Sequence, residues 1–196
     1  MKRIRLAIVF GLICAIMLSL ARFDVLCDDL RHNVFRLHIL ANSDSKEDQE
    51  LKLMVRDAVL KISRDMFVNC ENSQQAEQTA KNNLDVLKKE ALKVIKENNF
   101  DYEVEITVGP AYFENRDYED FTLPAGEYNA LNIKIGEAKG KNWWCVMFPS
   151  VCIGASSKLS DAVNNESANI AERSNDYKIR FKTVEIYESI KKLLKF

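Results

Sequence analysis

Histidine, proline and glycine are scarce in this chain of 196 residues, which contains only two, three and six of them. A hydrolytic zinc site needs three good ligands, and the chain has no His-Glu-x-x-His or Cys-x-x-Cys spacing to supply them. The glycines match no phosphate-binding spacing, and no serine lies in a Gly-x-Ser-x-Gly turn. We therefore expect no metal, no cofactor and no catalytic set of these kinds.

An excess of positive charge is also missing. The chain has 28 basic and 29 acidic residues. Residues 1–21 hold three basic residues and no acid, so the remainder has 25 minus 29, or a net charge of about −4. Nucleic-acid binding needs a basic stripe, which this composition does not provide. We therefore expect no nucleic-acid partner.

The N-terminus joins a basic flank to residues 6–21, which carry no charge. This pattern lies between a cleavable signal peptide, with an apolar core of ~7 to 15 residues, and a membrane anchor of ~17 to 25. Cleavage after Ala21 fits the small residues there, and a buried apolar helix is a third alternative. Because the basic flank stays inside, the rest of the chain is expected outside the cytoplasm. Membrane contact is expected only through residues 6–21, if they are retained.

Length and composition favour one folded domain. A chain with 47% hydrophobic residues can bury a core, and a domain takes ~100 to 200 residues. We divide the chain into a signal peptide or membrane anchor at 1–21, a charged spacer at 22–33 and a single α+β domain at 34–196.

Hydrophobic periodicity predicts an α+β fold. Alternation of apolar and polar residues predicts strands, at 34–41, 102–108, 117–123, 130–136, 143–148 and 177–181. Apolar residues recurring every three or four positions predict helices, at 46–66, 73–98, 158–169 and 184–194. This order is typical of a largely antiparallel sheet with helices packed on one side, here preceded by the signal or anchor segment.

The segment 140–152 holds both tryptophans, two of the five cysteines and one of the three prolines. Trp143 and Trp144 are adjacent on a predicted strand, so their side chains point to opposite faces. One ring is expected in the core. The other covers a second buried layer, binds a partner or lines an active site.

Cys145 and Cys152 are the natural disulfide pair of an exported chain, because a turn at Pro149 can bring them together. Two separate buried thiols are the alternative. A disulfide would compete with a catalytic pair of Cys145 or Cys152 with His38. His38 alternates with the core face of its strand, so we expect a structural histidine on the solvent side or under a helix.

Asn42, Ser43 and Asp44 follow the first predicted strand and precede the first predicted helix. Short polar side chains here can cap the helix, but capping explains only one of them. With an exposed tryptophan they would form a rim for protein binding, since aromatic residues contribute much of the energy of interfaces. Asp48 and Lys52 are an i,i+4 pair and are expected on the solvated side of the helix.

Two stretches resemble the stage II sporulation protein R family. The first has Ala-Asn-Ser-Asp-Ser at 41–45, flanked by Phe-Arg-Leu-His-Ile-Leu at 35–40 and Leu-Lys-Leu-Met-Val-Arg-Asp at 51–57. The second has Leu-Pro-Ala-Gly-Glu-Tyr at 123–128 and Gly-Lys-Asn-Trp-Trp-Cys-Val at 140–146, followed by Phe-Pro and Cys152. Together the two stretches span most of the chain after the leader.

The resemblance implies a signalling protein and no enzyme. Members are made in the forespore of an endospore-forming bacterium, and are secreted into, or anchored in, the intermembrane space between forespore and mother cell. They activate a membrane-embedded aspartic protease of the mother cell from its extracytoplasmic side, and the protease then processes the precursor of sigma factor E. The resemblance supplies no contact residues, and those expected from the sequence itself are Asn42, Ser43, Asp44, Trp143 and Trp144.

Two other classes of function stay open. One is a secreted thiol- or carboxylate-dependent hydrolase of the septal space, using Cys145 or an acidic pair. The other is an anchored structural protein of that space, in which Trp143 and Trp144 would both be fully buried.

Overall fold

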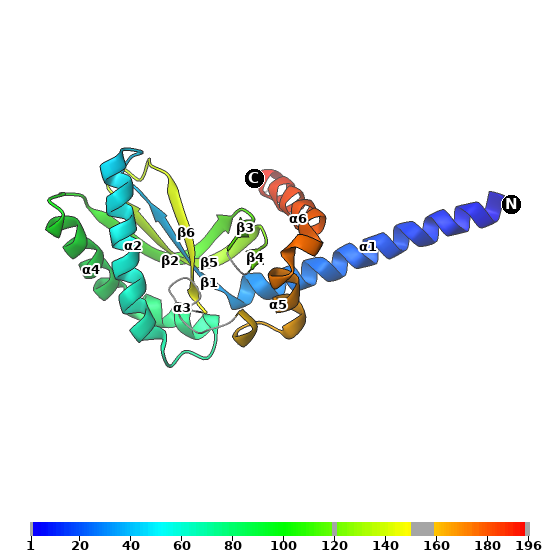
Figure 1. The fold of residues 1–196 in the computed structure, drawn as a ribbon, viewed down its shortest axis with the longest axis horizontal. Coiled ribbons are helices and arrows are strands. Elements are labelled where there is room, and N and C mark those ends of the chain that lie inside the picture. The colour runs from blue at the N-terminus through cyan, green and yellow to red at the C-terminus, as the bar shows by residue number, and fades with distance from the viewer. Residues whose placement is uncertain (1, 119–120, 150–158, 195–196) are drawn as a thin grey trace.

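The computed structural model describes residues 2–118, 121–149 and 159–194 (Figure 1). Its helices are α1 (Lys2–Asn33), α2 (Lys46–Phe67), α3 (Ser73–Asn82), α4 (Leu84–Glu97), the short 3-10 helix η1 (Leu159–Asp161), α5 (Asn165–Glu172) and α6 (Ser174–Leu194). Its strands are β1 (Phe35–Leu40), β2 (Val104–Phe113), β3 (Arg116–Asp117), β4 (Thr122–Leu123), β5 (Gly126–Ile135) and β6 (Asn142–Phe148).

The main sheet has four strands in the order β2-β5-β1-β6. β5 pairs antiparallel with β2, and β6 pairs antiparallel with β1. β1 and β5 are parallel, with Leu37 opposite Leu131, because the chain crosses over through α2, α3 and α4 between them. The expected α+β class and the predominance of antiparallel pairing are confirmed.

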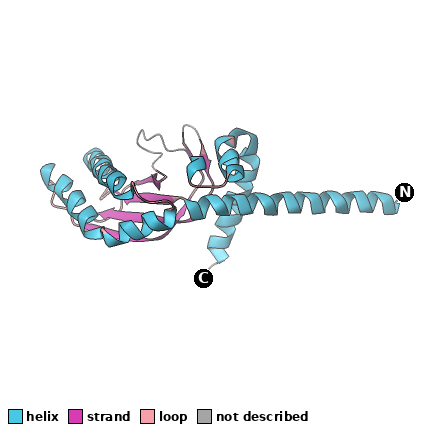
Figure 2. Cartoon of the chain, turned by 90° about the horizontal axis from the view of Figure 1, so that it is seen from below, coloured by secondary structure: helices cyan, strands magenta, loops and turns pink. Residues whose placement is uncertain are grey.

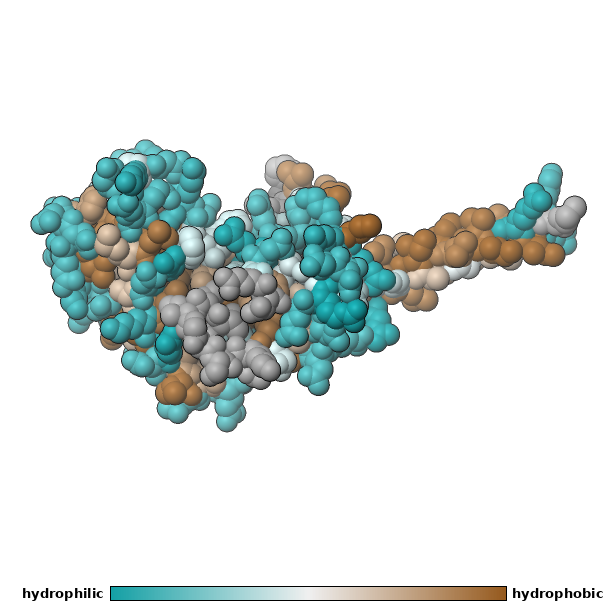
Figure 3. All heavy atoms as spheres, in the orientation of Figure 1, coloured by the Kyte–Doolittle hydropathy of each residue, from teal (hydrophilic) through white to brown (hydrophobic). Residues whose placement is uncertain are grey.

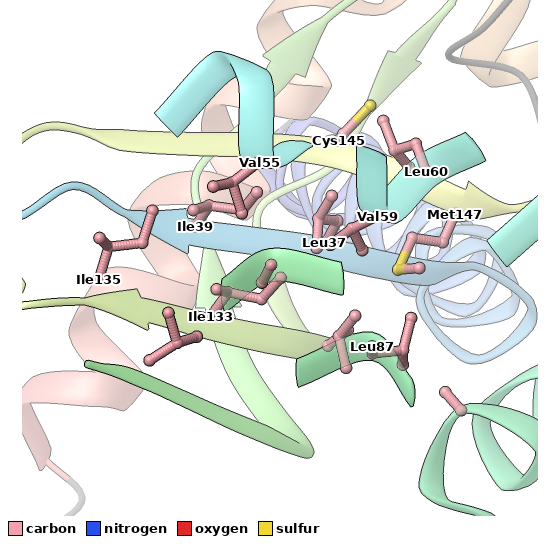
Figure 4. Packing of buried hydrophobic residues seen from close by; sticks show 14 of the residues in the cluster. Leu37, Ile39, Val55, Val59, Leu60, Leu87, Ile133, Ile135, Cys145 and Met147 are labelled. Carbon is pink, nitrogen blue, oxygen red and sulfur yellow. The ribbon is translucent and has the colours of Figure 1, made fainter. Parts of the chain in front are cut away.

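The first core lies between one face of the sheet and α2 and α4 (Figure 4). Alternate residues of the strands point into it, as the period of two requires: Leu37, Ile39, Ile133, Ile135, Cys145 and Met147. α2 contributes Val55 and Val59 to this core. Each fully buried aliphatic side chain stabilises the fold by about 1.5–3 kcal/mol, so this face accounts for much of the stability of the domain.

A second core covers part of the opposite face of the sheet. Phe113, Tyr128 and Val146 of the sheet contact residues of α1, η1, α5 and α6 in it. α1 contributes Phe23, Cys27 and Leu30, which are all buried. The segment 22–33 was expected to be a spacer, and this was wrong, because its apolar residues recur at helical spacing and pack into this core.

The first half of α1 projects from the domain (Figures 1 and 2). Among the residues that the structure describes, α1 is the helix long and apolar enough to cross a membrane, and none of its most apolar window is buried. A signal sequence has the same properties. The alternative of an apolar helix buried in the fold is therefore excluded for residues 6–21.

Three other predicted elements differ in the structure. The helix expected at 73–98 is two helices, α3 and α4, which meet at Asn83. The strand expected at 117–123 is divided between β3 and β4, which pair with each other. The helix expected at 158–169 is replaced by η1 and α5, and α5 begins after Asn164, whose side chain accepts a hydrogen bond from the Ser167 amide.

The strand expected at 177–181 is also wrong, because these residues belong to α6. Tyr177 and Phe181 are four residues apart, so their spacing fits one face of a helix as well as one face of a strand. Ile179 would share that face in a strand. In the structure Ile179 is 84% exposed while Phe181 is buried, as helical geometry requires.

Candidate functional site

The polar residues at the end of β1 meet at one buried carboxylate. Asp48, in the first turn of α2, is only 4% exposed. Asn42 donates a hydrogen bond from Nδ2 to Asp48 Oδ2 at 2.8 Å, and Ser43 Oγ donates to the same oxygen at 2.5 Å. The Tyr102 hydroxyl is a third side-chain partner of this carboxylate. We call Asn42, Ser43, Asp48 and Tyr102 the Asp48 junction.

The hydrogen bonds of the junction favour the charged form of the acid. Burial by itself raises the pKa of a carboxyl group. The hydrogen bonds from Ser43, Asn42 and Tyr102 outweigh that effect, so that the pKa of Asp48 is lowered. Asp48 is therefore a charged residue inside the fold, whereas the sequence had placed it on the solvated side of α2.

The same segment also binds the loop between β5 and β6. Asn42 Oδ1 accepts from the Glu137 amide at 2.9 Å, and Asp44 Oδ1 accepts from the Lys141 amide at 2.7 Å. Gly136 has a positive φ of 56°, and a Cβ there would overlap the Asn42 side chain. The three rim residues expected to bind a partner thus make their polar contacts within the chain.

The N-terminus of α2 is capped by another residue. Ser45 is the N-cap, and its hydroxyl accepts from the Asp48 amide. Lys52 is 3% exposed and does not pair with Asp48, because its Nζ donates to the Lys141 carbonyl at 2.9 Å and to Gln49 Oε1 at 2.7 Å. Periodicity alone placed Lys52 with the exposed charges, and its burial depends on a loop that lies far away in the sequence.

The two tryptophans point to opposite faces of the sheet, as predicted. Trp143 packs against the first core, and the Arg56 guanidinium lies 4.3 Å from the centre of its ring. Trp144 packs against the second core, 5.5 Å from Phe113 and 6.0 Å from His38 between ring centres. Both rings are only half-buried, which contradicts the expectation for a purely structural protein.

Next to Trp144 the sheet presents polar side chains. His38 lies between two amide oxygens, with Nδ1 at 3.3 Å from Asn132 Oδ1 and Nε2 at 2.7 Å from Asn142 Oδ1. Lys134 is exposed and pairs with Glu105 on β2. His38 is half-buried on the side away from α2, as expected. We call His38, Asn132, Lys134, Asn142 and Trp144 the open face.

An arginine of α1 contacts the Leu-Pro-Ala-Gly-Glu-Tyr turn at 123–128. Arg31 Nε donates to the Ala125 carbonyl at 3.0 Å, and Arg31 Nη1 donates to Asp28 at 2.6 Å. Gly126 has a φ of 146°, and a Cβ there would collide with the Arg31 side chain. The Tyr128 hydroxyl donates to the Pro124 carbonyl at 2.6 Å. This turn therefore joins α1 to the start of β5.

Arg36 was not identified from the sequence. It is fully buried, with its guanidinium carbon 3.9 Å from the centre of the Phe113 ring and 4.7 Å from that of Tyr128. Its Nη2 donates to the Tyr118 hydroxyl at 2.8 Å. The alternation around Phe35 and Leu37 could have placed Arg36 on the second face of the sheet, but no local signal shows that this face is covered.

The described residues do not bring together the cysteine thiol and the histidine that a catalytic pair would need. Cys145 points into the first core, whereas His38 points to the opposite side of the sheet, so the sheet separates them. Within the ranges 2–118, 121–149 and 159–194, no group of three histidine, cysteine or acidic side chains could hold a metal ion. Cys152 lies outside the described residues, so its disulfide with Cys145 stays a prediction. Cys14, Cys27 and Cys70 are free thiols.

Comparison with known proteins gives one consistent result. Residues 31–158 match the family model described as stage II sporulation protein R. The chain is 35% identical to stage II sporulation protein R of Bacillus subtilis (strain 168) over 117 residues, which are 60% of this chain and 52% of that protein. The chain thus spans about half the length of this curated relative. No solved structure matches the chain.

Proposed function

Because the chain belongs to the stage II sporulation protein R family, we propose that it is an exported intercellular signal of endospore formation. In this proposal it activates a membrane-embedded aspartic protease of the mother cell, and the protease processes the precursor of sigma factor E. The chain acts as a ligand, and catalysis belongs to its partner. The sporulation role follows from the family, and the partner and the process it controls are our inference.

The apolar first half of α1 supports export. As a signal peptide or an anchor it would deliver residues from 22 onward into the space between forespore and mother cell, where the chain is secreted or stays anchored. An oxidising extracytoplasmic space also favours the proposed disulfide between Cys145 and Cys152. That bond would connect β6 to the chain that follows it.

The observation that carries the proposal is the open face. It places a half-buried indole, a histidine and two amides on one side of the sheet, in a composition suited to protein recognition. We propose that Trp144 is the contact residue of this face with the extracytoplasmic part of the protease. Asn42 and Asp44 hold the adjoining β5–β6 loop in place, Ser43 binds Asp48, and Trp143 supports the sheet from the side of the first core.

The binding test compares variants of the open face with variants on the far side of the domain. Trp144→Ala and Asn142→Ala should stop processing of the sigma-factor precursor while secretion continues. Loss of a central aromatic contact costs about 2 kcal/mol or more, which is roughly a 30-fold loss of affinity. Val86→Ala, on the exposed side of α4, is the control and should process normally.

Two results would contradict the proposal. If folded, secreted Trp144→Ala and Asn142→Ala proteins support full processing, the open face is not the binding surface. If the purified chain hydrolyses peptide or cell-wall substrates, the alternative of a secreted hydrolase replaces the signalling function. Folding of each variant is checked by its urea unfolding curve, so that a merely unstable protein is recognised.

A further inference from the structure

α5 and α6 pack against α1 at the place where its apolar run ends. Arg22 follows that run directly and pairs with Glu166 of α5 at 2.6 Å. The Phe23 ring lies 5.9 Å from the Tyr177 ring and 5.2 Å from the Phe181 ring of α6. If α1 enters a bilayer through residues 6–21, α6 therefore begins at the level of the membrane surface.

α6 has a second apolar face that nothing in the described chain covers. Its buried face includes Phe181 and Val184. On the opposite side, four aliphatic residues recur at intervals of seven, four and three positions and are 50–84% exposed: Ile179, Ile186, Ile190 and Leu193. Figure 3 shows hydrophobic atoms on α6 close to the hydrophobic surface of α1. A contiguous exposed stripe of this kind marks an interaction surface.

The charges beside the stripe indicate what covers it. Among the α6 side chains that the structure describes, the exposed basic residues are Lys178, Arg180, Lys182 and Lys191. Lys182 and Lys191 also pair with Glu185 and Glu188 of the same helix. An apolar stripe flanked by lysine and arginine is the composition of helices that lie in a membrane interface. A second copy of the chain, packed through the same stripe, would bring like charges together, which disfavours a symmetric dimer.

A groove between α1, α5 and α6 lies on the side of α6 that faces α1. It has a volume of about 430 Å³, and its lining includes Arg22, Phe23, Glu166, Tyr177 and Arg180. The Arg180 guanidinium offers donors for phosphate oxygens, whereas Arg22 is paired with the Glu166 carboxylate. The aromatic rings are of the kind found at the headgroup level of membranes. The groove thus offers a basic group and aromatic rings to a phospholipid headgroup.

We propose that the stripe of α6 and this groove form a lipid face that binds the surface of a bilayer rich in anionic phospholipid. The aliphatic residues enter the boundary of the acyl chains, and Arg180 contacts phosphates. The inference requires that α1 acts as a signal or anchor segment and goes beyond the proposed signalling role. The domain is then held against the membrane by α6, and the contact persists if the leader is removed.

The test places a reporter on α6 in the full chain, incorporated into vesicles through α1. The reporter is Ile190→Trp, because Ile190 is 50% exposed. The matched control is Val86→Trp on α4, where Val86 is 47% exposed. The vesicles contain brominated phosphatidylglycerol or brominated phosphatidylcholine, which quench indoles that enter the lipid. The emission of the unsubstituted chain is subtracted. Ile190→Trp should lose emission in phosphatidylglycerol vesicles and much less in phosphatidylcholine, whereas Val86→Trp should lose none.

Charge removal tests the choice of lipid. In the Ile190→Trp background, Lys178→Gln with Lys182→Gln should lower the ratio of lipid-bound to free α6 by roughly fivefold per lysine. Quenching no greater than that of Val86→Trp would overturn the proposal. Equal quenching by both lipids, or no effect of the lysines, would overturn the preference for anionic lipid. An emission shift that depends on protein concentration and not on lipid would assign the stripe to a second copy instead.

Discussion

Replacement of Asn42 by alanine tests whether the Asp48 junction holds the domain together. The substitution removes the donor at 2.8 Å from Asp48 and the acceptor at 2.9 Å from the Glu137 amide. A hydrogen bond to a charged group contributes about 1.5–3 kcal/mol. The exposed Glu137 amide can bond to water, so its loss adds little. We expect Asn42→Ala to lower the free energy of unfolding by about 2 kcal/mol, and the melting temperature by about 4 to 8 °C.

The pH dependence gives this prediction a sharper test. The pKa of Asp48 is lower in the folded chain than in the unfolded chain, so the folded state is stabilised above the unfolded value of about 3.9. That stabilisation is lost as the pH falls through the folded pKa. Asn42→Ala brings the two pKa values closer together. The difference in stability between the parent and the variant should therefore be largest at neutral pH and shrink in acid.

The assay is urea unfolding of the full chain in detergent, followed by tryptophan emission at pH 7 and at pH values down to about 3. Glu47→Gln is the control, because Glu47 lies in the same helical turn but is exposed. It should change stability by less than about 0.5 kcal/mol. A difference between parent and Asn42→Ala that does not vary with pH would refute the assigned role of the Asp48 charge.

Two further predictions follow from the same region of the sheet. The mass of the secreted chain should rise by two hydrogens on reduction if Cys145 and Cys152 are bonded, and an unchanged mass would refute the disulfide; the same spectrum shows whether the leader has been cleaved. Gly140→Ala should lower the free energy of unfolding by about 2 kcal/mol or more, because a Cβ there would overlap the Ser43 carbonyl. Gly109→Ala is the matched control on β2, where a Cβ meets no atom within 4 Å, and equal stability of the two variants in urea unfolding would contradict the clash.

Local patterns predicted the parts of the fold that depend on chain geometry alone. The alternation in 104–108 and 130–135 could be assigned to strands because one face of each is apolar, and both segments are strands in the structure. The opposite orientations of Trp143 and Trp144 follow from the period of two along a strand. The apolar run at 6–21 predicted a segment outside the core for the same kind of local reason.

Burial of polar residues could not be predicted in this way, because it depends on contacts between distant parts of the chain. Asp48 is a buried acid only because Asn42, Ser43 and Tyr102 surround it. Lys52 is buried by the Lys141 carbonyl, 89 positions away. From the sequence alone, Asp48 and Lys52 resemble ordinary surface charges of an amphipathic helix. Periodicity identifies the apolar face of a helix but does not show which segments cover its polar face.

Composition and local spacing were enough to predict the class of fold, the apolar N-terminal segment and the absence of a zinc motif, and the two motif stretches pointed to the family. These features are encoded in composition and in spacings of a few residues. Long-range contacts are needed to see that Asn42 and Asp44 hold the β5–β6 loop, that residues 22–33 are part of a core, and that Trp144 belongs to the open face. These depend on which segments meet after folding, and short-range periodicity carries no information about that.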